Sequence, residues 1–338
     1  FIFLLIILGG FFLFQGSKTW EIEPVGDMNS KRTLGLKSVT ETLGSEVSST
    51  LVLDKPKNIN GDIENQLPLS NFSAGIKAIY VTGWSAGSTK KIDSLIKLID
   101  ETELNAIVVD VKDYSGFLSY KFDYDLARES GAFNELRIIK PNILIKKLHD
   151  KGIYVIGRIS IFQDPILAEA HPDWAIKSSS TKKVWKDRKG LAWMDPASRE
   201  VWAYNLKIAK DALSRGFDEI NFDYIRFPSD GDLNDLSYST WNEKTSMADV
   251  IEGFFKYMRG NLKDAKISAD LFGLVAIEKS DLGIGQVLEK AFPYFDYIAP
   301  MIYPSHFGSG VMGFKNPAAH PYEVIKNSLI SAINKLKI

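Results

Sequence analysis

The sequence predicts an α/β fold, a (β/α)8 TIM barrel that is incomplete at its C-terminus, with about six βα units present. From Gly75 onward, short runs rich in Val, Ile and Phe alternate with segments of helical period, which is the order of a parallel sheet. Those runs are apolar on both faces, as in parallel strands covered on both sides. Residues 81–88 lack the G-x-G-x-x-G spacing of a doubly wound nucleotide-binding sheet, which favours the barrel.

Each strand is predicted from a β-branched or aromatic run bounded by Gly, Pro or polar residues. The strands cover residues 76–82, 106–111, 153–162, 219–227, 267–272 and 297–303. Each helix is predicted from apolar residues three and four apart, together with capping residues. The helices cover residues 91–104, 141–148, 195–216, the segment from Val250 to Met258, residues 285–291 and the segment from Tyr322 to the terminus.

Two segments precede the predicted barrel of residues 74–338. Residues 1–14 are apolar apart from Gly9 and Gly10, and no small-x-small cleavage pattern precedes Ser17. Because a span needs about 20 residues and the chain begins with Phe1, we expect residues 1–16 to be the remainder of an uncleaved membrane anchor. The alternatives are a removed signal peptide, which would make the protein secreted, and a buried core segment. The polar residues 17–73 predict a low-order linker, with one short pairing strand at residues 50–53.

Composition excludes several kinds of chemistry. The formal net charge is −1 without a basic stripe, which argues against nucleic acid as a partner. There is no cysteine, so disulfides, thiol catalysis and Cys-ligated zinc are excluded. No His/Asp/Glu spacing suggests a metal and no Ser-His elbow is present, so neither a metal nor another cofactor is expected.

Polar side chains recur near the C-terminal ends of the predicted strands, the end where such barrels build active sites. In the fourth strand, alternation places Asn221 and Asp223 opposite Ile220 and Phe222, and Arg226 follows. The other strands contribute Tyr80, Thr82 and Trp84, Asp110 and Lys112, Arg158 and Ser160, Ser268 and Asp270, and Tyr303. Carboxylates among basic, hydroxyl and aromatic groups suit acid–base chemistry on a saccharide.

Each of these residues also has a structural interpretation. Asp223 could form an ion pair with Arg226, Asp110 could form one with Lys112, and Asp270 could cap a loop. Arg158 could neutralise Asp223 or Asp110 without touching substrate, and Tyr303 could be a rim or core aromatic. The segment with Trp174, Trp185 and Trp193 could be a sugar platform or the small core of its own loop.

Five segments in order resemble an uncharacterised bacterial family of glycosyl hydrolase domains, distantly similar to α-amylase-type barrels. They are Gly75-Ile-Lys-Ala-Ile-Tyr-Val-Thr-Gly83, Asn105-Ala-Ile-Val-Val-Asp-Val-Lys-Asp113, Gly157-Arg-Ile-Ser-Ile-Phe-Gln-Asp164, Phe222-Asp-Tyr-Ile-Arg-Phe-Pro228 and Pro300-Met-Ile-Tyr-Pro-Ser305. The resemblance extends from about Gly75 to the terminus and implies a barrel outside the cytoplasm, often behind an N-terminal anchor. It also implies that Asp223, at the end of the fourth strand, is the nucleophile, whereas strand parity alone selects Asp270 as the proton donor. Family members carry further strands after the segment seen here.

The resulting hypothesis is a membrane-tethered glycoside hydrolase that acts on an extracytoplasmic or cell-wall polysaccharide. Asp223 would be nucleophile or base and Asp270 proton donor. The expected substrate-binding residues are Asp110, Lys112, Arg158, Asn221, Arg226, Tyr303 and Trp84. The alternatives are a non-catalytic glycan-binding barrel at the cell surface, and a lyase or deacetylase, for which Lys112 is the one Schiff-base candidate.

Overall fold

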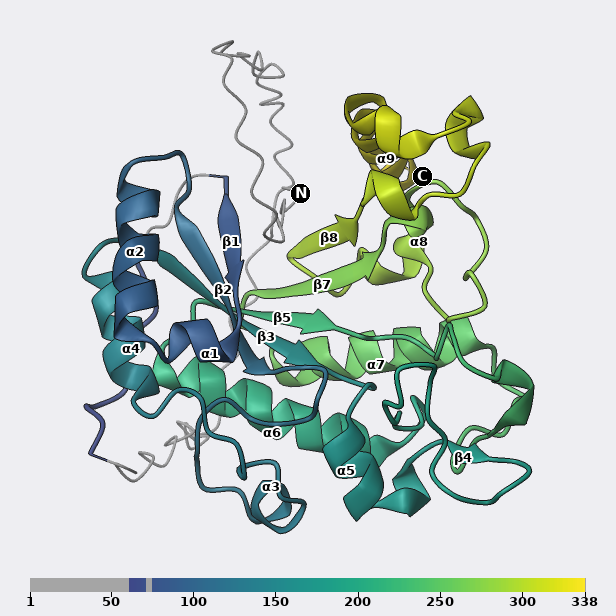
Figure 1. Ribbon diagram of the computed structural model, residues 1–338, viewed down its shortest axis with the longest axis horizontal. Coiled ribbons are helices and arrows are strands. Elements are labelled where there is room, and N and C mark those ends of the chain that lie inside the picture. The colour runs from purple at the N-terminus through teal and green to yellow at the C-terminus, as the bar shows by residue number, and fades with distance from the viewer. Residues whose placement is uncertain (1–60, 71–74, 338) are drawn as a thin grey trace, which may run out of the picture. The chain divides into compact units, whose positions relative to one another are not determined.

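The computed structural model describes residues 61–70 and 75–337 (Figure 1). The predicted anchor, most of the predicted linker and the pairing strand at residues 50–53 lie outside these ranges. Within them, no helix combines the length and apolar character needed to cross a bilayer.

A parallel sheet of six strands dominates the described residues, in the order β1-β2-β3-β5-β7-β8. Its strands are β1 (Ala78–Val81), β2 (Ala106–Lys112), β3 (Tyr154–Ser160), β5 (Glu219–Asp223), β7 (Ile267–Phe272) and β8 (Tyr297–Met301). Figure 1 shows this sheet curled, with helices along its outer side. The strand order follows the chain order, which is the arrangement of a barrel wall rather than of a doubly wound sheet. The predicted TIM-barrel fold, with six βα units present, is therefore confirmed.

Helices follow the strands as the βα pattern predicts. The longer ones are α2 (Thr89–Asp100), α4 (Pro141–His149), α6 (Arg199–Arg215), α7 (Met247–Asn261) and α9 (Pro321–Leu336). Shorter ones lie in the connections, namely α1 (Gly83–Ala86), α3 (Asp125–Glu129), α5 (Pro165–Ala170) and α8 (Leu288–Ala291). The long connection after β3 and the one after β5 meet in a small antiparallel pair, β4 (Lys177–Ser178) with β6 (Leu236–Ser237).

Several predicted boundaries differ from the structure, and two of the differences have a clear local cause. Helix α6 begins at Arg199, because the hydroxyl of Ser198 caps it by accepting a bond from the Val201 amide. Asp195 instead accepts bonds from the amides of Ala197, Thr240 and Trp241, which fastens the connection after β5. The strand predicted at 219–227 ends at Asp223, because Tyr224 has a φ of +52°, in the left-handed region.

The inner face of the sheet is apolar along most of its length. Ala78, Ala106, Val108, Tyr154, Ile156 and Ala299 form an interior cluster, with Tyr80 and Tyr297 packed against it. The register places Asp110 beside Arg158, and Arg158 beside Asn221. Apart from Glu219 and Ser268, which lie near the starts of β5 and β7, the polar inward residues therefore gather beyond this cluster, toward the carboxyl ends of the strands.

Residues 61–70, which fall within the predicted linker, contain no helix or strand but are bonded to the barrel. Asp62 accepts bonds from the amides of Asn142 and Ile143 at the start of α4, at 2.8 and 3.1 Å. The amide of Gln66 donates to the carbonyl of Arg215 at 3.0 Å. This segment therefore satisfies backbone groups at two helix ends that would otherwise lack partners.

Candidate active site

Four charged side chains from four strands meet at the carboxyl end of the sheet. They are Asp110 from β2, Arg158 from β3, Asp223 from β5 and Asp270 from β7. Arg158 Nη1 lies 2.7 Å from Asp110 Oδ1, and its Nη2 lies 2.5 Å from Asp223 Oδ2. Arg158 Nε lies 3.2 Å from the same Asp223 oxygen and 3.9 Å from Asp270 Oδ2. One guanidinium thus connects three carboxyl groups. Strand alternation predicted that these side chains would lie together at this end of the barrel.

Asp110 holds Arg158 in place. It is only 1% exposed, and its second oxygen accepts a 2.5 Å bond from the Tyr80 hydroxyl. Burial raises the pKa of Asp110, and Arg158 opposes that rise. Since both carboxylate oxygens of Asp110 are bonded and it lines neither pocket described below, it positions the guanidinium rather than reaching a substrate.

Asp270 is a carboxyl group that keeps its proton. Burial and the nearby charge of Asp223 raise its pKa from 3.8 to about 8, against the attraction of Arg158. The Nδ2 of Asn221 donates to Asp270 Oδ1 at 2.9 Å and to Ser268 Oγ at 3.1 Å. Asn221 is fully buried, so it orients Asp270 and does not make the predicted contact with substrate.

The backbone turns sharply directly after Asp223. Its Oδ1 accepts a 2.6 Å bond from the Tyr224 amide, and Tyr224 has the left-handed φ described above. A bulky residue in this region costs on the order of 1–3 kcal/mol, and such strain clusters at functional sites. The turn carries the Tyr224 ring to the wall of the pocket beside Asp223.

A pocket of about 350 Å³, here called the Asp223 pocket, opens at this turn. It is lined by Asp223, Tyr224, Arg226, Phe272, Gly273, Leu274, Met301, Tyr303, His306 and Phe307. Tyr303 is thus brought beside the carboxylates as predicted, and burial together with the charges of Asp270 and Asp223 raises its pKa to about 12. Gly273 is required in this wall, since a Cβ there would lie 2.5 Å from the Met301 carbonyl oxygen.

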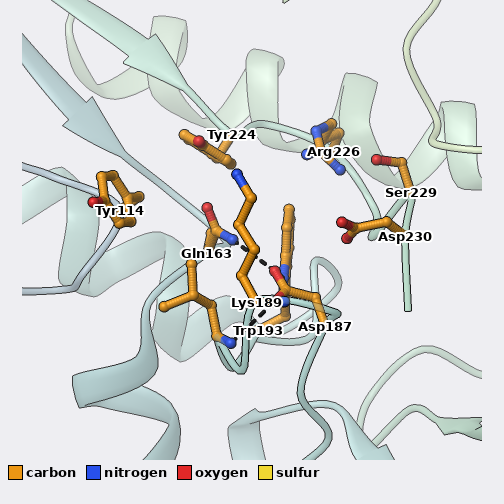
Figure 2. A pocket seen from close by; sticks show the side chains of 10 residues that line it. Tyr114, Gln163, Asp187, Lys189, Trp193, Tyr224, Arg226, Ser229 and Asp230 are labelled. Carbon is orange, nitrogen blue, oxygen red and sulfur yellow. Dashed lines mark hydrogen bonds between the residues drawn. The ribbon is translucent and has the colours of Figure 1, made fainter. Parts of the chain in front are cut away.

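A second pocket of about 270 Å³, here called the Trp193 pocket, shares Tyr224 and Arg226 with the first (Figure 2). Its other lining residues are Tyr114, Gln163, Asp187, Lys189, Leu191, Trp193, Ser229 and Asp230. The residues that follow β5 therefore form a wall common to two neighbouring pockets, one of which contains Asp223.

Arg226 is buried in that wall, at 8% exposure. Its guanidinium carbon lies 4.7, 4.8 and 5.6 Å from the ring centres of Trp193, Phe272 and Tyr224. Nη1 donates to the Phe227 carbonyl at 3.0 Å. Among the described residues no carboxylate lies within 4 Å of Arg226, so the Asp223–Arg226 ion pair weighed above does not form. Burial lowers the pKa of Arg226.

Lys112 does not join the cluster. A register shift between Asp110 and Lys112 pairs Lys112 with Ile159, which turns its side chain away from the barrel mouth. Lys112 is 0% exposed, and its Nζ lies 2.6 Å from Asp164 Oδ2. The expected substrate contact was therefore wrong for this structure, as was the alternative pairing with Asp110.

The tryptophans divide between surface and core. Trp84, in α1, is 61% exposed and faces the Arg137 guanidinium at 5.4 Å, and it lines neither pocket. Trp185 and Trp193 are buried, and their indole N–H groups donate to the Asp232 carbonyl and to Asp187 Oδ2. The small-core interpretation of this segment is therefore confirmed, although the edge of Trp193 also forms part of a pocket wall.

Glu219 is a buried acid that the strand pattern did not single out. It is fully buried on the inward face of β5, two residues before Asn221, and the Tyr154 hydroxyl lies 3.3 Å from its Oε2. Burial raises its pKa to about 7. The alternation that selected Asn221 and Asp223 also points to Glu219, but its place near the start of the strand separates it from the mouth.

At the carboxyl ends of its strands, where barrel enzymes build their active sites, this curled parallel sheet carries three aspartates around one arginine. Within the described ranges, no group of three or more His, Asp or Glu side chains is arranged to hold a metal ion. The chain belongs to the family described as "Putative glycosyl hydrolase domain", which residues 78–337 match.

Comparison with solved structures found several similar chains. A hypothetical protein from Ruminiclostridium thermocellum ATCC 27405 is 38% identical, with a TM-score of 0.52 over 56% of this chain and 96% of its own. TtGalA, an α-galactosidase from Thermus thermophilus, is 11% identical, with a TM-score of 0.45 over 78% of this chain and 50% of its own. The α-galactosidase from Lactobacillus brevis is 12% identical, with a TM-score of 0.42 over 79% of this chain and 32% of its own. None of the curated proteins compared with the chain matches it.

Proposed function

We propose that this protein hydrolyses glycosidic bonds in a polysaccharide outside the cytoplasm, with Asp270 as proton donor and Asp223 as nucleophile or general base. The observation that supports this assignment is the contrast between the two groups. Asp270 has a pKa of about 8, whereas Asp223 is bonded to the Arg158 guanidinium. Glycosidases need such a pair, one carboxyl to protonate the leaving oxygen and one carboxylate on the other side of the anomeric carbon.

The surrounding residues assist this chemistry by position. Asp110 and Tyr80 fix Arg158, which in turn orients Asp223. Asn221 directs Asp270, and Tyr303 lines the pocket beside Asp223. As positive charge develops on the sugar ring, the Asp223 carboxylate would stabilise it, and Asp270 would release its proton to the departing oxygen.

The test of the catalytic assignment is Asp223→Asn, assayed on a panel of cell-wall and extracellular polysaccharides. We expect hydrolysis to fall by at least about 1,000-fold, because the variant keeps the shape but loses the charge that stabilises the transition state. Asp264→Asn, at an exposed position on the other end of the barrel, is the matched control and should retain full activity. Circular dichroism would verify folding, and an unchanged rate in a folded Asp223→Asn would reject the assignment.

Proton NMR of the first product distinguishes the two roles of Asp223. Retention of the anomeric configuration would make it the nucleophile, and inversion would make it the base. The apolar residues 1–14 support the further proposal that the barrel is tethered to a membrane and lies on its outer side. Fractionation of cells, with protease added outside, would test this location.

One observation favours a second candidate, a glycan-binding barrel without turnover. Both Asp110 and Asp223 are already bonded to Arg158, and Asp270 is only 4% exposed, as in a structural ion network. Glycan arrays that detect affinity where prolonged incubation yields no product would support this candidate.

A further inference from the structure

Cationic side chains concentrate in the connection that forms β4. The set of Lys182, Lys183, Lys186, Arg188 and Lys189, here called the basic loop, lies within eight consecutive residues and is exposed throughout. In the described part of the chain, Lys186 alone among them has an ion-pair partner, Glu169. The whole chain has a net charge of −1, so this density of positive charge is local.

Asp187, the acid within the basic loop, is buried and saturated by hydrogen bonds. Its Oδ2 accepts bonds from Gln163 Nε2 at 3.0 Å and Trp193 Nε1 at 3.1 Å. Its Oδ1 accepts bonds from the amides of Lys189 and Leu191, at 2.9 and 3.0 Å. These contacts fix the loop against the Trp193 pocket, and Figure 2 shows the Lys189 side chain extended across that pocket.

Two buried polar groups in the Trp193 pocket keep hydrogen-bonding capacity that the described residues do not use. Arg226 is nine-tenths buried, and apart from the bond to the Phe227 carbonyl and the ring contacts it has no carboxylate within 4 Å among the described residues, although an unpaired buried charge is costly. Gln163 is 4% exposed, and its Oε1 has no hydrogen-bond partner in the described structure, so this acceptor is open to a sugar hydroxyl rather than to an anion. Both side chains line the pocket, as Figure 2 shows.

We propose that the Trp193 pocket and the basic loop bind an anionic group on the glycan, so that the substrate is an acidic polysaccharide bearing carboxylate, phosphate or sulfate. This inference rests on the proposed function and specifies its substrate class. The planar guanidinium of Arg226 offers paired donors to such an anion, and its aromatic surroundings strengthen the attraction by excluding water.

The pocket also contains acids, which restrict where the anion can lie. Asp230 lines the same pocket, and Asp187 adds a charge that four N–H donors offset. The anion must therefore lie directly against the N–H donors of Arg226 and Lys189. The exposed ring of Tyr114 and the half-buried ring of Tyr224 are available to a sugar face. The remaining cations of the loop attract the polymer over a longer range and are screened by salt.

Binding is measured by calorimetry on full-length Asp223→Asn, which cannot consume the ligand. The probes are oligogalacturonate, poly(glycerol phosphate) and dextran sulfate, each paired with a neutral counterpart, namely the methyl ester, glycerol oligomers and dextran. We expect at least one anionic probe to bind about 10-fold tighter than its neutral partner, with affinity that falls as NaCl rises. If no anionic probe exceeds its partner, the proposal is overturned.

Variants separate the pocket from general charge. Arg226→Gln should weaken binding of the preferred anion at least about 10-fold, and Lys189→Gln about 3-fold. Lys256→Gln, which removes an exposed charge on α7, is the matched control and should leave the affinity unchanged. Equal losses in all three variants would contradict a specific site.

Two further outcomes distinguish this inference from the proposed function. Anionic binding without any cleavage by the wild type would reject the hydrolase and preserve the anion site. Cleavage of neutral glycans with no preference for charge would support the hydrolase and reject the anion site. Binding to vesicles of phosphatidylglycerol and phosphatidylcholine that is unaffected by Arg226→Gln, with no glycan bound, would assign the basic loop to a membrane surface and overturn the proposal.

Discussion

At the scale of single residues, the site depends on one arginine shared by three aspartates. Arg158 contacts Asp110 and Asp223 directly and lies 3.9 Å from Asp270. A single positive charge does not favour ionisation of all three buried carboxyls, so Asp270, the one at the longest distance, keeps its proton. The difference in distance from Arg158 thus separates the acid from the base.

Because Asp270 is protonated, a rise in pH should lower the activity of the wild type and should raise the stability of an Asp270→Asn variant relative to the wild type. Hydrolysis by the wild type should fall as pH rises through about 8, where Asp270 loses the proton it donates. The raised pKa also means that the contribution of Asp270 to stability is largest below a pH of about 4, its pKa in the unfolded chain, and declines as pH rises to about 8.

Asp270→Asn should therefore be nearly inactive, and its melting temperature relative to the wild type should increase between pH 5 and pH 9, by about 2 °C or more. Scanning calorimetry at both values measures this difference. A relative melting temperature that stays constant would show that Asp270 does not titrate as described.

Sequence alternation located Asp110, Arg158, Asp223 and Asp270 because side chains in a strand project to alternate faces and parallel strands end together. It could not locate Arg226, whose orientation depends on rings from three separate segments. It also could not foresee that Asn221 binds another side chain instead of substrate, since that depends on Asp270 in the adjacent strand.

At the scale of elements, local irregularities decide which residues enter the site. The register shift in β2 moves Lys112 out of the mouth, and alternation cannot predict it, because the period of two fails at an extra residue. The left-handed turn at Tyr224 likewise ends β5 four residues before the predicted boundary. The sequence pattern of aromatic and branched residues continues past this turn, so composition alone overestimates the strand.

The position of Lys112 predicts a structural role that can be separated from binding. Asp164 bonds both Lys112 and the amide of Leu167 at the start of α5. Lys112→Ala leaves that carboxylate buried without its cation, which should destabilise the protein by about 3–5 kcal/mol.

Urea unfolding measures this loss, and Lys151→Ala, at an exposed site, should cost less than about 0.5 kcal/mol. At a temperature where Lys112→Ala remains folded, its affinity for glycans should equal that of the wild type. Weaker binding by the folded variant would show that Lys112 contributes to substrate binding.

At the scale of the whole molecule, the order of strands follows the order of the sequence, and this made the fold predictable. Each βα unit packs on the preceding one, so local patterns of period 2 and 3.6 are sufficient to build the wall. The contacts of residues 61–70 were not predictable in this way. They join groups about 80 residues apart through hydrogen bonds from backbone amides to one carboxylate, and such bonds leave no periodic pattern.

Asp62→Ala tests the importance of this distant contact. The variant leaves the amides of Asn142 and Ile143 without their acceptor at the start of α4, which should lower stability by about 1–2 kcal/mol. Glu64→Ala, two residues away and with no side-chain hydrogen bond or ion pair to the described residues, should change stability by less than about 0.5 kcal/mol. Thermal unfolding of both variants provides the comparison, and equal melting temperatures would show that the segment is dispensable.

The shared wall of Tyr224 and Arg226 has a consequence for how a polymer would be oriented. On one side lie three aspartates around a single arginine, and on the other lie Lys189 and the exposed cations near it. The anionic groups of a polymer that crosses this wall would be attracted beside Lys189 and repelled beside the aspartates. This charge pattern would favour a ligand whose charged groups lie on the Lys189 side while an uncharged sugar reaches Asp223.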